Sequence, residues 1–360
     1  MSQSCLNTNE EDCWVIEFDN LVSKTYTLNN LLLNNKNGLT DKRFVIIPYN
    51  NFKNNNYIQY NVVKTKLLDL KIQPQTQTQK IIFKPLISKQ EYLEKINFLK
   101  NQIQLGNIYE INFCVKFEAQ VQKLDVLSVF VKLIELSNTN YNYLVKLNNQ
   151  YIICCSPELF LKKEDDLLYT KPIKGTIKRG NTNKIDEELK LQLKNSIKDK
   201  TEHVMAVDVA RNDLSMIAQR GTVNVNKLYN IESYKTVHQM VTTVFCKLKE
   251  NVSFDQIIEA TFPMASMTGA PKQKAIEIIS ATENFERNYY SGTFGFIKQN
   301  NDFELPVVIR SLFYNDLTGE LSFAVGGAIT NLSNPYQEFD ECLLKAQTMI
   351  NSVNGQLIWD

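Results

Sequence analysis

The sequence predicts an α+β protein whose sheets are mostly antiparallel. Strand-like runs rich in β-branched and aromatic residues lie near one another, and helical patterns are inserted between them irregularly rather than in strict alternation. The chain has 360 residues, 43% hydrophobic and 22% charged, which is enough to bury a large core. One large domain or two closely packed domains fit this length. We find no internal repeat.

The segment from Ser88 to Gly106 carries the signals of an amphipathic helix. Ser88 and Glu91 have capping-box spacing, apolar residues recur at helical intervals, and Gly106 ends the pattern. Residues 107–117 alternate roughly and predict a strand. Further strands are expected at 151–155, 167–175, 292–297, 306–314 and 321–330, and further helices at 186–206, 254–261, 271–281 and 337–351.

The first 84 residues differ in composition from the rest. Asparagine-rich runs such as "TLNNLLLNNKNG" predict surface loops between strands, and "KIQPQTQTQK" predicts a connection to the next region. We therefore expect a strand-rich, Asn-rich N-terminal region at 1–84 that packs on the main region at 85–355.

Charge and cysteine content exclude several classes of protein. The net charge of +1 gives no sign of a nucleic-acid or membrane surface, so a small-molecule partner is expected. The N-terminus has no signal-like apolar core and no apolar run reaches about 18 residues, which predicts a cytoplasmic protein. The seven cysteines form no C-x-x-C pair and are expected to be reduced. With only two histidines, any metal should be a hard cation held by carboxylates.

Four acidic residues stand out as candidate site residues. Glu158 follows a proline after an apolar strand, and Glu202 lies on a largely apolar helix. Glu338 and Glu341 share one helix face, with Lys345 one turn beyond Glu341. Taken singly, each acid is also typical of a surface position or of a helix N-terminus.

Two cations have unusual surroundings. Lys174 lies between Pro172, which fixes φ, and Gly175, which permits positive φ, so it belongs either to a sharply shaped turn or to a solvated loop. Arg310 interrupts an apolar strand pattern, and a buried arginine needs an anion. That anion is either an internal carboxylate or the carboxylate of a ligand.

Nine short motifs between about residue 85 and residue 351 occur in an order typical of one family: "SPELFL", "PIKGTIKRG", "EHVMAVDVARNDL", "VHQMVTTV", "FPMASMTGAPKQKAIEII", "GTFGFI", "VIRSLF", "GGAIT" and "EFDECLLKA". With them the chain resembles the chorismate-utilising enzymes, which include anthranilate synthase component I, isochorismate synthase and aminodeoxychorismate synthase component I. The resemblance implies the anthranilate-synthase type of fold, with two large, mostly antiparallel sheets packed face to face and helices outside. Region 85–355 would bind chorismate between the sheets and catalyse its conversion.

The residue at position 174 separates activities within that family. Anthranilate synthases have a similar stretch, "PIAGT", with alanine at this position, whereas the para-specific aminodeoxychorismate synthases that the chain resembles have lysine. The resemblance thus implies that Lys174 attacks C2 of chorismate as the C4 hydroxyl leaves, and that ammonia then adds at C4 and expels the lysine. The product would be 4-amino-4-deoxychorismate, used for p-aminobenzoate and folate. Because only the free amine attacks, we expect burial beside a cation to lower the pKa of Lys174.

The resemblance also implies roles for the other candidates. Glu158 would protonate the departing C4 hydroxyl as general acid. Mg²⁺ would be held on the ring carboxylate by Glu202 and Glu341, with Glu338 nearby. Arg310 would bind the carboxylate of the enolpyruvyl arm. Further contacts with substrate are implied for His238, which would line the ring, and for Thr176, Phe296, Gly326, Gly327 and Lys345. Phe296 stands where many relatives have tyrosine, so one hydrogen bond to substrate is expected to be missing.

The source of ammonia lies outside these motifs. No glutaminase nucleophile motif is visible, so a separate glutamine amidotransferase subunit or free ammonia is expected as the source. Two alternatives to the para-specific activity remain: anthranilate synthase component I, and a non-catalytic chorismate-binding subunit. The second is disfavoured because the acid, nucleophile and metal positions are all filled.

Glu110, in "NIYEINF", departs from the family pattern. Isochorismate synthases resemble this stretch but place lysine there, and most ammonia-using relatives place glutamine. The absence of lysine argues against isochorismate formation. Glu110 either pairs with a lysine at a strand edge or lies beside C2 of chorismate and pairs with Lys174, in which case it would raise the pKa of that lysine.

Overall fold

The computed structural model describes residues 13–19, 22–30, 42–50, 57–68, 80–235 and 237–360. Its helices are α1 (Lys89–Gln104), α2 (Val126–Ser137), α3 (Asn183–Asn195), α4 (Ile197–Ile217), α5 (Phe254–Thr261), α6 (Lys272–Thr282) and α7 (Pro335–Ser352). The strands are β1 (Cys13–Asp19), β2 (Val22–Asn30), β3 (Lys42–Ile47), β4 (Ile58–Leu68), β5 (Ile82–Pro85), β6 (Glu110–Gln120), β7 (Tyr141–Leu147), β8 (Gln150–Ser156), β9 (Leu159–Glu164), β10 (Leu167–Thr170), β11 (Ile173–Lys178), β12 (Asn224–Ser233), β13 (Val237–Lys247), β14 (Gly269–Ala270), β15 (Thr293–Lys298), β16 (Phe303–Pro306), β17 (Ser311–Asn315), β18 (Glu320–Ile329) and β19 (Gln356–Leu357).

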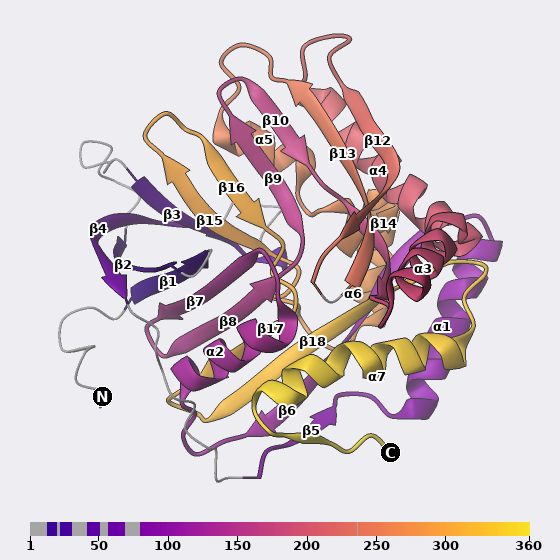
Figure 1. Ribbon diagram of the computed structural model, residues 1–360, viewed down its shortest axis with the longest axis horizontal. Coiled ribbons are helices and arrows are strands. Elements are labelled where there is room, and N and C mark those ends of the chain that lie inside the picture. The colour runs from indigo at the N-terminus through magenta and orange to yellow at the C-terminus, as the bar shows by residue number, and fades with distance from the viewer. Residues whose placement is uncertain (1–12, 20–21, 31–41, 51–56, 69–79, 236) are drawn as a thin grey trace.

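The strands form two halves that are joined by hydrogen bonds. The first half runs β5, β6, β18, β17, β8, β7, and the second runs β15, β16, β9, β10, β13, with β11 and β12 both on β13. Strands β1, β2, β4 and β3 connect them by pairing with β7 at one side and β15 at the other. All of these pairs are antiparallel, and Figure 1 shows the strands of the two halves running in different directions.

Two hydrophobic cores fix the layers. In the outer core, Phe117 and Phe323 stack on the first half beneath Tyr92 of α1 and Phe339 of α7. In the inner core, residues of both halves pack together with α4 and α5, which places the halves face to face. Helices α1, α2 and α7 cover the outer face of the first half. The predicted α+β architecture is confirmed.

The N-terminal strands are part of this arrangement. They enclose a third core of aromatic and aliphatic residues together with β7, β8 and β15. The boundary expected near residue 84 stays a prediction, and the asparagine-rich segments at 31–41 and 51–56 lie outside the described residues. Cys154 and Cys155 are adjacent on β8 and point to different cores, as the alternation of side chains along a strand requires. Both are free thiols. No helix in the described ranges is long and apolar enough to cross a membrane.

Several boundaries follow the predicted signals. Helix α1 begins after Ser88 with a complete capping box, in which the Glu91 amide donates to Ser88 Oγ at 3.1 Å and the Ser88 amide donates to Glu91 Oε2 at 2.8 Å. The helices expected at 254–261, 271–281 and 337–351 correspond to α5, α6 and α7.

Three expected elements are each divided in two. The helix expected at 186–206 breaks at Ser196, which ends α3 and caps α4. The strand expected at 167–175 is interrupted at Pro172, giving β10 and β11. The strand expected at 306–314 was also wrong, because β16 ends at Pro306 and β17 begins at Ser311. Arg310 lies in that break with φ of 49°.

Candidate active site

Lys174 is positioned by an irregularity in β11. The register of β11 against β13 shifts between Ile173 and Thr176, so Lys174 and Gly175 form a bulge. Gly175 has φ of 78°, and a Cβ there would lie 2.9 Å from Asp199 Oδ1. Glycine is therefore required at this position for two reasons: it adopts the positive φ without strain, and it leaves room for the close approach of α4. The Pro-Ile-Lys-Gly sequence encodes a shaped strand segment rather than a solvated loop.

Lys174 forms a buried ion pair with Glu110. Its Nζ lies 2.6 Å from Glu110 Oε1, and the two side chains are 9% and 4% exposed. Burial alone would lower the pKa of Lys174, but the charges of Glu110 and Glu202 outweigh it, so the pKa is raised. Of the two alternatives for Glu110, pairing with Lys174 is the one found, and its position beside C2 of chorismate stays a prediction. The expectation of a lowered pKa was wrong for the resting protein, because the neighbouring charges are anionic.

Glu110 is held in place by a close strand contact. It begins β6 and pairs with Ala270 of β14. Gly269, with φ of 152°, approaches so closely that a Cβ would lie 2.2 Å from the Glu110 carbonyl oxygen. Only glycine fits there, and it fixes the backbone from which the Glu110 side chain projects.

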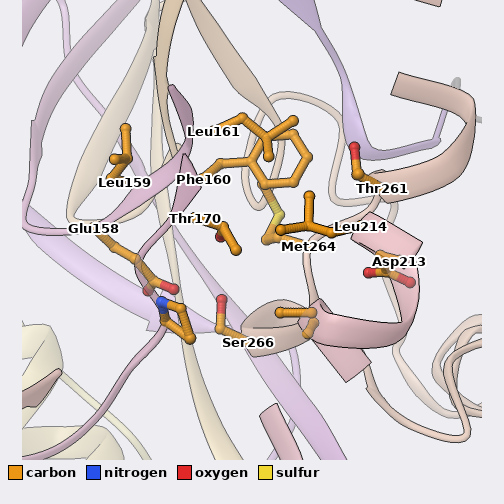
Figure 2. Close-up of a pocket in the computed structure, with 13 residues that line it drawn as sticks. Glu158, Leu159, Phe160, Leu161, Thr170, Asp213, Leu214, Thr261, Met264 and Ser266 are labelled. Carbon is orange, nitrogen blue, oxygen red and sulfur yellow. The ribbon is translucent and has the colours of Figure 1, made fainter. Parts of the chain in front are cut away.

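Glu158 has the environment of a general acid. It lies between β8 and β9, and its amide donates to Ser156 Oγ at 3.2 Å. Burial raises the pKa of Glu158 to about 7, while the charge of Lys174 acts in the opposite direction. A carboxyl group with this pKa holds its proton near neutral pH and can donate it. Figure 2 shows the Glu158 carboxyl beside Ser266, at one side of a pocket whose wall also includes Asp213.

The three carboxylates predicted to hold a metal are brought together with two lysines. Lys198 Nζ lies 2.9 Å from Glu338 Oε1 and 3.9 Å from Glu202 Oε1. Lys345 Nζ lies 2.7 Å from Glu341 Oε1 and donates to the Gly326 carbonyl at 3.0 Å. Burial raises the pKa of Glu202 to about 7, and the charges of Glu110 and Glu338 add to this. Helices α4 and α7 thus face each other through a charged cluster.

The donor chemistry of this cluster fits a hard divalent ion. Glu202 Oε1 is buried and has no hydrogen-bond partner, which leaves an acceptor available for a cation. Glu338 is 3% exposed and its carboxylate needs a counter-charge. Among the described residues, however, no three His, Cys, Asp or Glu side chains converge on one point as a ready-made metal site. A lysine lies within 3 Å of two of the three carboxylates, Glu338 and Glu341, whereas the contact of Glu202 with Lys198 is longer, at 3.9 Å.

The two glycines of β18 differ in what surrounds them. A Cβ on Gly326 would lie 2.4 Å from Asn112 Oδ1, so packing within the protein already requires glycine there. A Cβ on Gly327 would meet its nearest atom, Glu338 Oε2, only at 3.8 Å. Packing thus does not explain Gly327, which borders open space beside Glu338 and suits the approach of a ligand.

Arg310 has the character of a ligand-binding cation. Among the described residues, no carboxylate forms an ion pair with its guanidinium group, and Glu158 acts on it only through its charge. Burial lowers its pKa, while the charges of Cys155 and Glu158 act in the opposite direction. Of the two anions considered from the sequence, an internal carboxylate, that of Glu158, acts on Arg310 without a direct ion pair. Pairing of Arg310 with the carboxylate of a ligand stays a prediction.

Three predicted substrate contacts have other partners in the structure. His238 Nε2 lies 3.0 Å from Asp186 Oδ1, and its Nδ1 lies 2.8 Å from Ser233 Oγ. Phe296 packs in the N-terminal core, with Lys42 Nζ 3.7 Å from its ring centroid. Gln239 donates to Thr176 Oγ1 at 3.4 Å. The roles of His238, Phe296 and Thr176 stay predictions.

Sequence reasoning missed Lys198. It precedes Glu202 by one helical turn, and that spacing was its only signal. Its approach to Glu338, 140 residues away, depends on the packing of α4 against α7. Such a tertiary contact has no trace in local sequence.

Comparisons with known proteins identify the family of the chain. Residues 35–351 match the chorismate binding enzyme family, and the chain belongs to that family. It is 39% identical over 277 residues to a protein from Arabidopsis thaliana named aminodeoxychorismate synthase, chloroplastic, covering 76% of this chain and 30% of that protein. It is 34% identical over 259 residues to aminodeoxychorismate synthase component 1 of Bacillus subtilis, covering 72% of this chain and 54% of that protein.

Solved structures share the fold. The menaquinone-specific isochorismate synthase of Escherichia coli superposes with a TM-score of 0.82 at 15% identity, covering 97% of this chain and 90% of that one. Anthranilate synthase component I of Streptococcus pneumoniae gives 0.76 at 19% identity, covering 93% and 89%. The predicted anthranilate-synthase type of fold is thereby confirmed. The chain spans only about a third of the plant relatives it matches.

Proposed function

We propose that the protein converts chorismate and ammonia to 4-amino-4-deoxychorismate. The observation that carries this proposal is the placement of Lys174, buried on β11 and within the electrostatic influence of Glu110, Glu158 and Glu202. Relatives named aminodeoxychorismate synthase, at 39% and 34% identity over most of this chain, support the same activity.

Lys174 and Glu158 divide the chemistry between them. The free amine of Lys174 bonds to C2, the two ring double bonds shift, and the C4–O bond breaks as Glu158 gives its proton to the departing hydroxyl, which leaves as water. Ammonia then bonds to C4, the double bonds shift back, and the C2–N bond breaks to release the lysine. The proton carried by the new C4 ammonium group returns to Glu158, so the sum is chorismate plus ammonia giving product plus water.

Other residues hold the substrate during these steps. Arg310 pairs with the enolpyruvyl carboxylate, and Gly327 leaves room for the ring beside Glu338. Glu202, Glu338 and Glu341 would hold Mg²⁺, which supplies positive charge to neutralise the ring carboxylate. Lys345 adds a cation at the same end of the site.

Ammonia would be supplied by a separate glutamine amidotransferase subunit. The name "component 1" of the Bacillus subtilis relative supports this reading, since it implies a second component. Free ammonium at alkaline pH should replace that partner in an assay.

The test is incubation of the purified protein with chorismate, Mg²⁺ and ammonium, followed by chromatography. A product that an added aminodeoxychorismate lyase converts to p-aminobenzoate would support the proposal. Anthranilate fluorescence would instead identify ortho chemistry, and chorismate binding without turnover would identify a non-catalytic subunit. Either of these results overturns the proposal.

A further inference from the structure

Each of three carboxylates in the candidate site has its own lysine within 3 Å. Glu110 pairs with Lys174, Glu341 with Lys345, and Glu338 with Lys198. Glu202 differs, because its Oε1 atom is buried without a hydrogen-bond partner. The ammonium group of Lys198 lies 3.9 Å from that atom.

Lys198 is the lysine that joins two of the proposed metal ligands. It lies in the first turn of α4, one turn before Glu202, and reaches Glu338 on α7. Its side chain is 39% exposed, whereas those of Glu338 and Glu202 are 2% and 10% exposed. The ammonium group therefore lies at the solvent side of two buried acids, on a flexible chain that can swing outward.

We propose that Lys198 is the resident counter-ion of the metal site, which holds Glu202 and Glu338 together without metal and is displaced when a divalent cation binds. This inference rests on the metal-binding part of the proposed function.

Electrostatics gives the reason. Buried carboxylates on facing helices repel one another and lose hydration, so a metal-free site needs an internal cation. A dication drawn to the same oxygens meets repulsion from an ammonium group about 4 Å away, which is substantial at a protein surface. Lys198 should thus stabilise the metal-free protein and weaken its affinity for the ion.

The other two lysines do not fit this role. Lys174 is 9% exposed and is the proposed nucleophile, so outward movement would remove it from the reaction. Lys345 pairs with Glu341, whose side chain is 44% exposed, and also donates to the Gly326 carbonyl. An exposed carboxylate needs no counter-ion to remain charged.

The test compares Lys198→Met with wild-type protein by calorimetric titration of Mg²⁺ alone and by thermal unfolding in excess chelator. Methionine keeps the aliphatic length and removes the charge. We expect Mg²⁺ to bind at least about tenfold more tightly to the variant, because a nearby positive charge has been removed. We also expect the variant to melt at a lower temperature than wild type when metal is absent.

Lys190→Met is the matched control, because Lys190 is 36% exposed and pairs with Glu187 on α3, away from the cluster. It should leave both measurements unchanged. Equal or weaker Mg²⁺ binding in Lys198→Met, or no binding to any of the three proteins, overturns the inference. Product formation does not enter this test, so the amination proposal can fail separately.

Discussion

The ammonium group of Lys174 and the carboxylate of Glu110 form a 2.6 Å contact between strands β11 and β6 that is almost closed to solvent. The pair holds Lys174 in its charged form, which cannot attack chorismate. The charge of Lys174 also interacts with the carboxylates of Glu202, Glu158 and Glu341. It acts on the His203 imidazole as well, whose pKa it lowers together with burial. Activity should therefore rise with pH as the lysine loses its proton, but only up to about pH 7, where Glu158 loses the proton that it must donate.

Glu110→Gln should shift the pH profile. Removing the anion lowers the pKa of Lys174, since the raised value depends on Glu110 and Glu202. The free amine then exists at lower pH, so the acidic limb of kcat/KM should move toward lower pH while the product stays the same. Glu118→Gln is the control, because Glu118 lies on the same strand but forms an exposed pair with Lys116. An unshifted limb in Glu110→Gln would show that the pair does not govern the nucleophile.

Lys174→Ala should abolish formation of 4-amino-4-deoxychorismate while retaining chorismate binding. The loss follows from removal of the nucleophile, and binding is retained because Arg310 and the carboxylate cluster lie on other elements. Intact-protein mass spectrometry of wild type, quenched after mixing with chorismate without ammonia, should show a covalent adduct on the peptide that contains Lys174. Wild-type rates of product formation in the alanine variant would exclude covalent catalysis by this residue.

Chelation should stop turnover reversibly. The buried, unpartnered Glu202 Oε1 atom marks a place where a cation is expected. Excess chelator should abolish activity, and added Mg²⁺ should restore it. Glu202→Gln should raise the Mg²⁺ concentration needed for half-maximal rate by about tenfold or more, since it removes one charged ligand. Full activity in excess chelator would make these carboxylates structural.

Gly327→Ala should impair substrate binding without disturbing the fold. The added methyl group would meet Glu338 Oε2 only at 3.8 Å, an ordinary contact, but it would enter the space in which we propose that chorismate binds. We expect a raised KM and an unchanged melting temperature. Gly326→Ala provides the contrast, because its methyl group would collide with Asn112 and should lower the melting temperature. A normal KM in Gly327→Ala would mean that chorismate does not approach this strand.

The parts of this structure that the sequence predicts are those encoded locally. The capping box of α1 and the helical spacing of Glu338 and Glu341 are local signals, and each one holds. The break at Ser196 was missed because a serine that caps a new helix resembles an ordinary polar residue on a continuous one. Arg310 was assigned to a strand because its neighbours are apolar, although its φ of 49° interrupts the ladder.

In the candidate site, too, local sequence predicts some features, and others depend on tertiary packing. Family motifs identify Lys174 and Glu158, whereas contacts across elements, such as Lys198 with Glu338, depend on packing that no motif records. The sign of the pKa shift at Lys174 illustrates the consequence. Burial could be inferred from the sequence, but the balance of charges around the buried lysine required the positions of Glu110 and Glu202.

A buried ion pair beneath the site should contribute to the stability of the fold. Arg287 and Glu283 form a 2.6 Å pair with both side chains at most 2% exposed, and Arg287 also donates to the carbonyls of Asn112 and Met267. Arg287→Leu should lower the free energy of unfolding by about 3–5 kcal/mol, because it leaves the Glu283 carboxylate buried and unpaired. Denaturant unfolding measures this loss. Replacing Glu283 with leucine as well should recover part of it, since no isolated charge remains. Lys274→Leu, which breaks an exposed pair with Glu277, should change stability by no more than about 0.5 kcal/mol. If the double variant is no more stable than Arg287→Leu, the cost arises from the lost carbonyl contacts rather than from the orphaned charge.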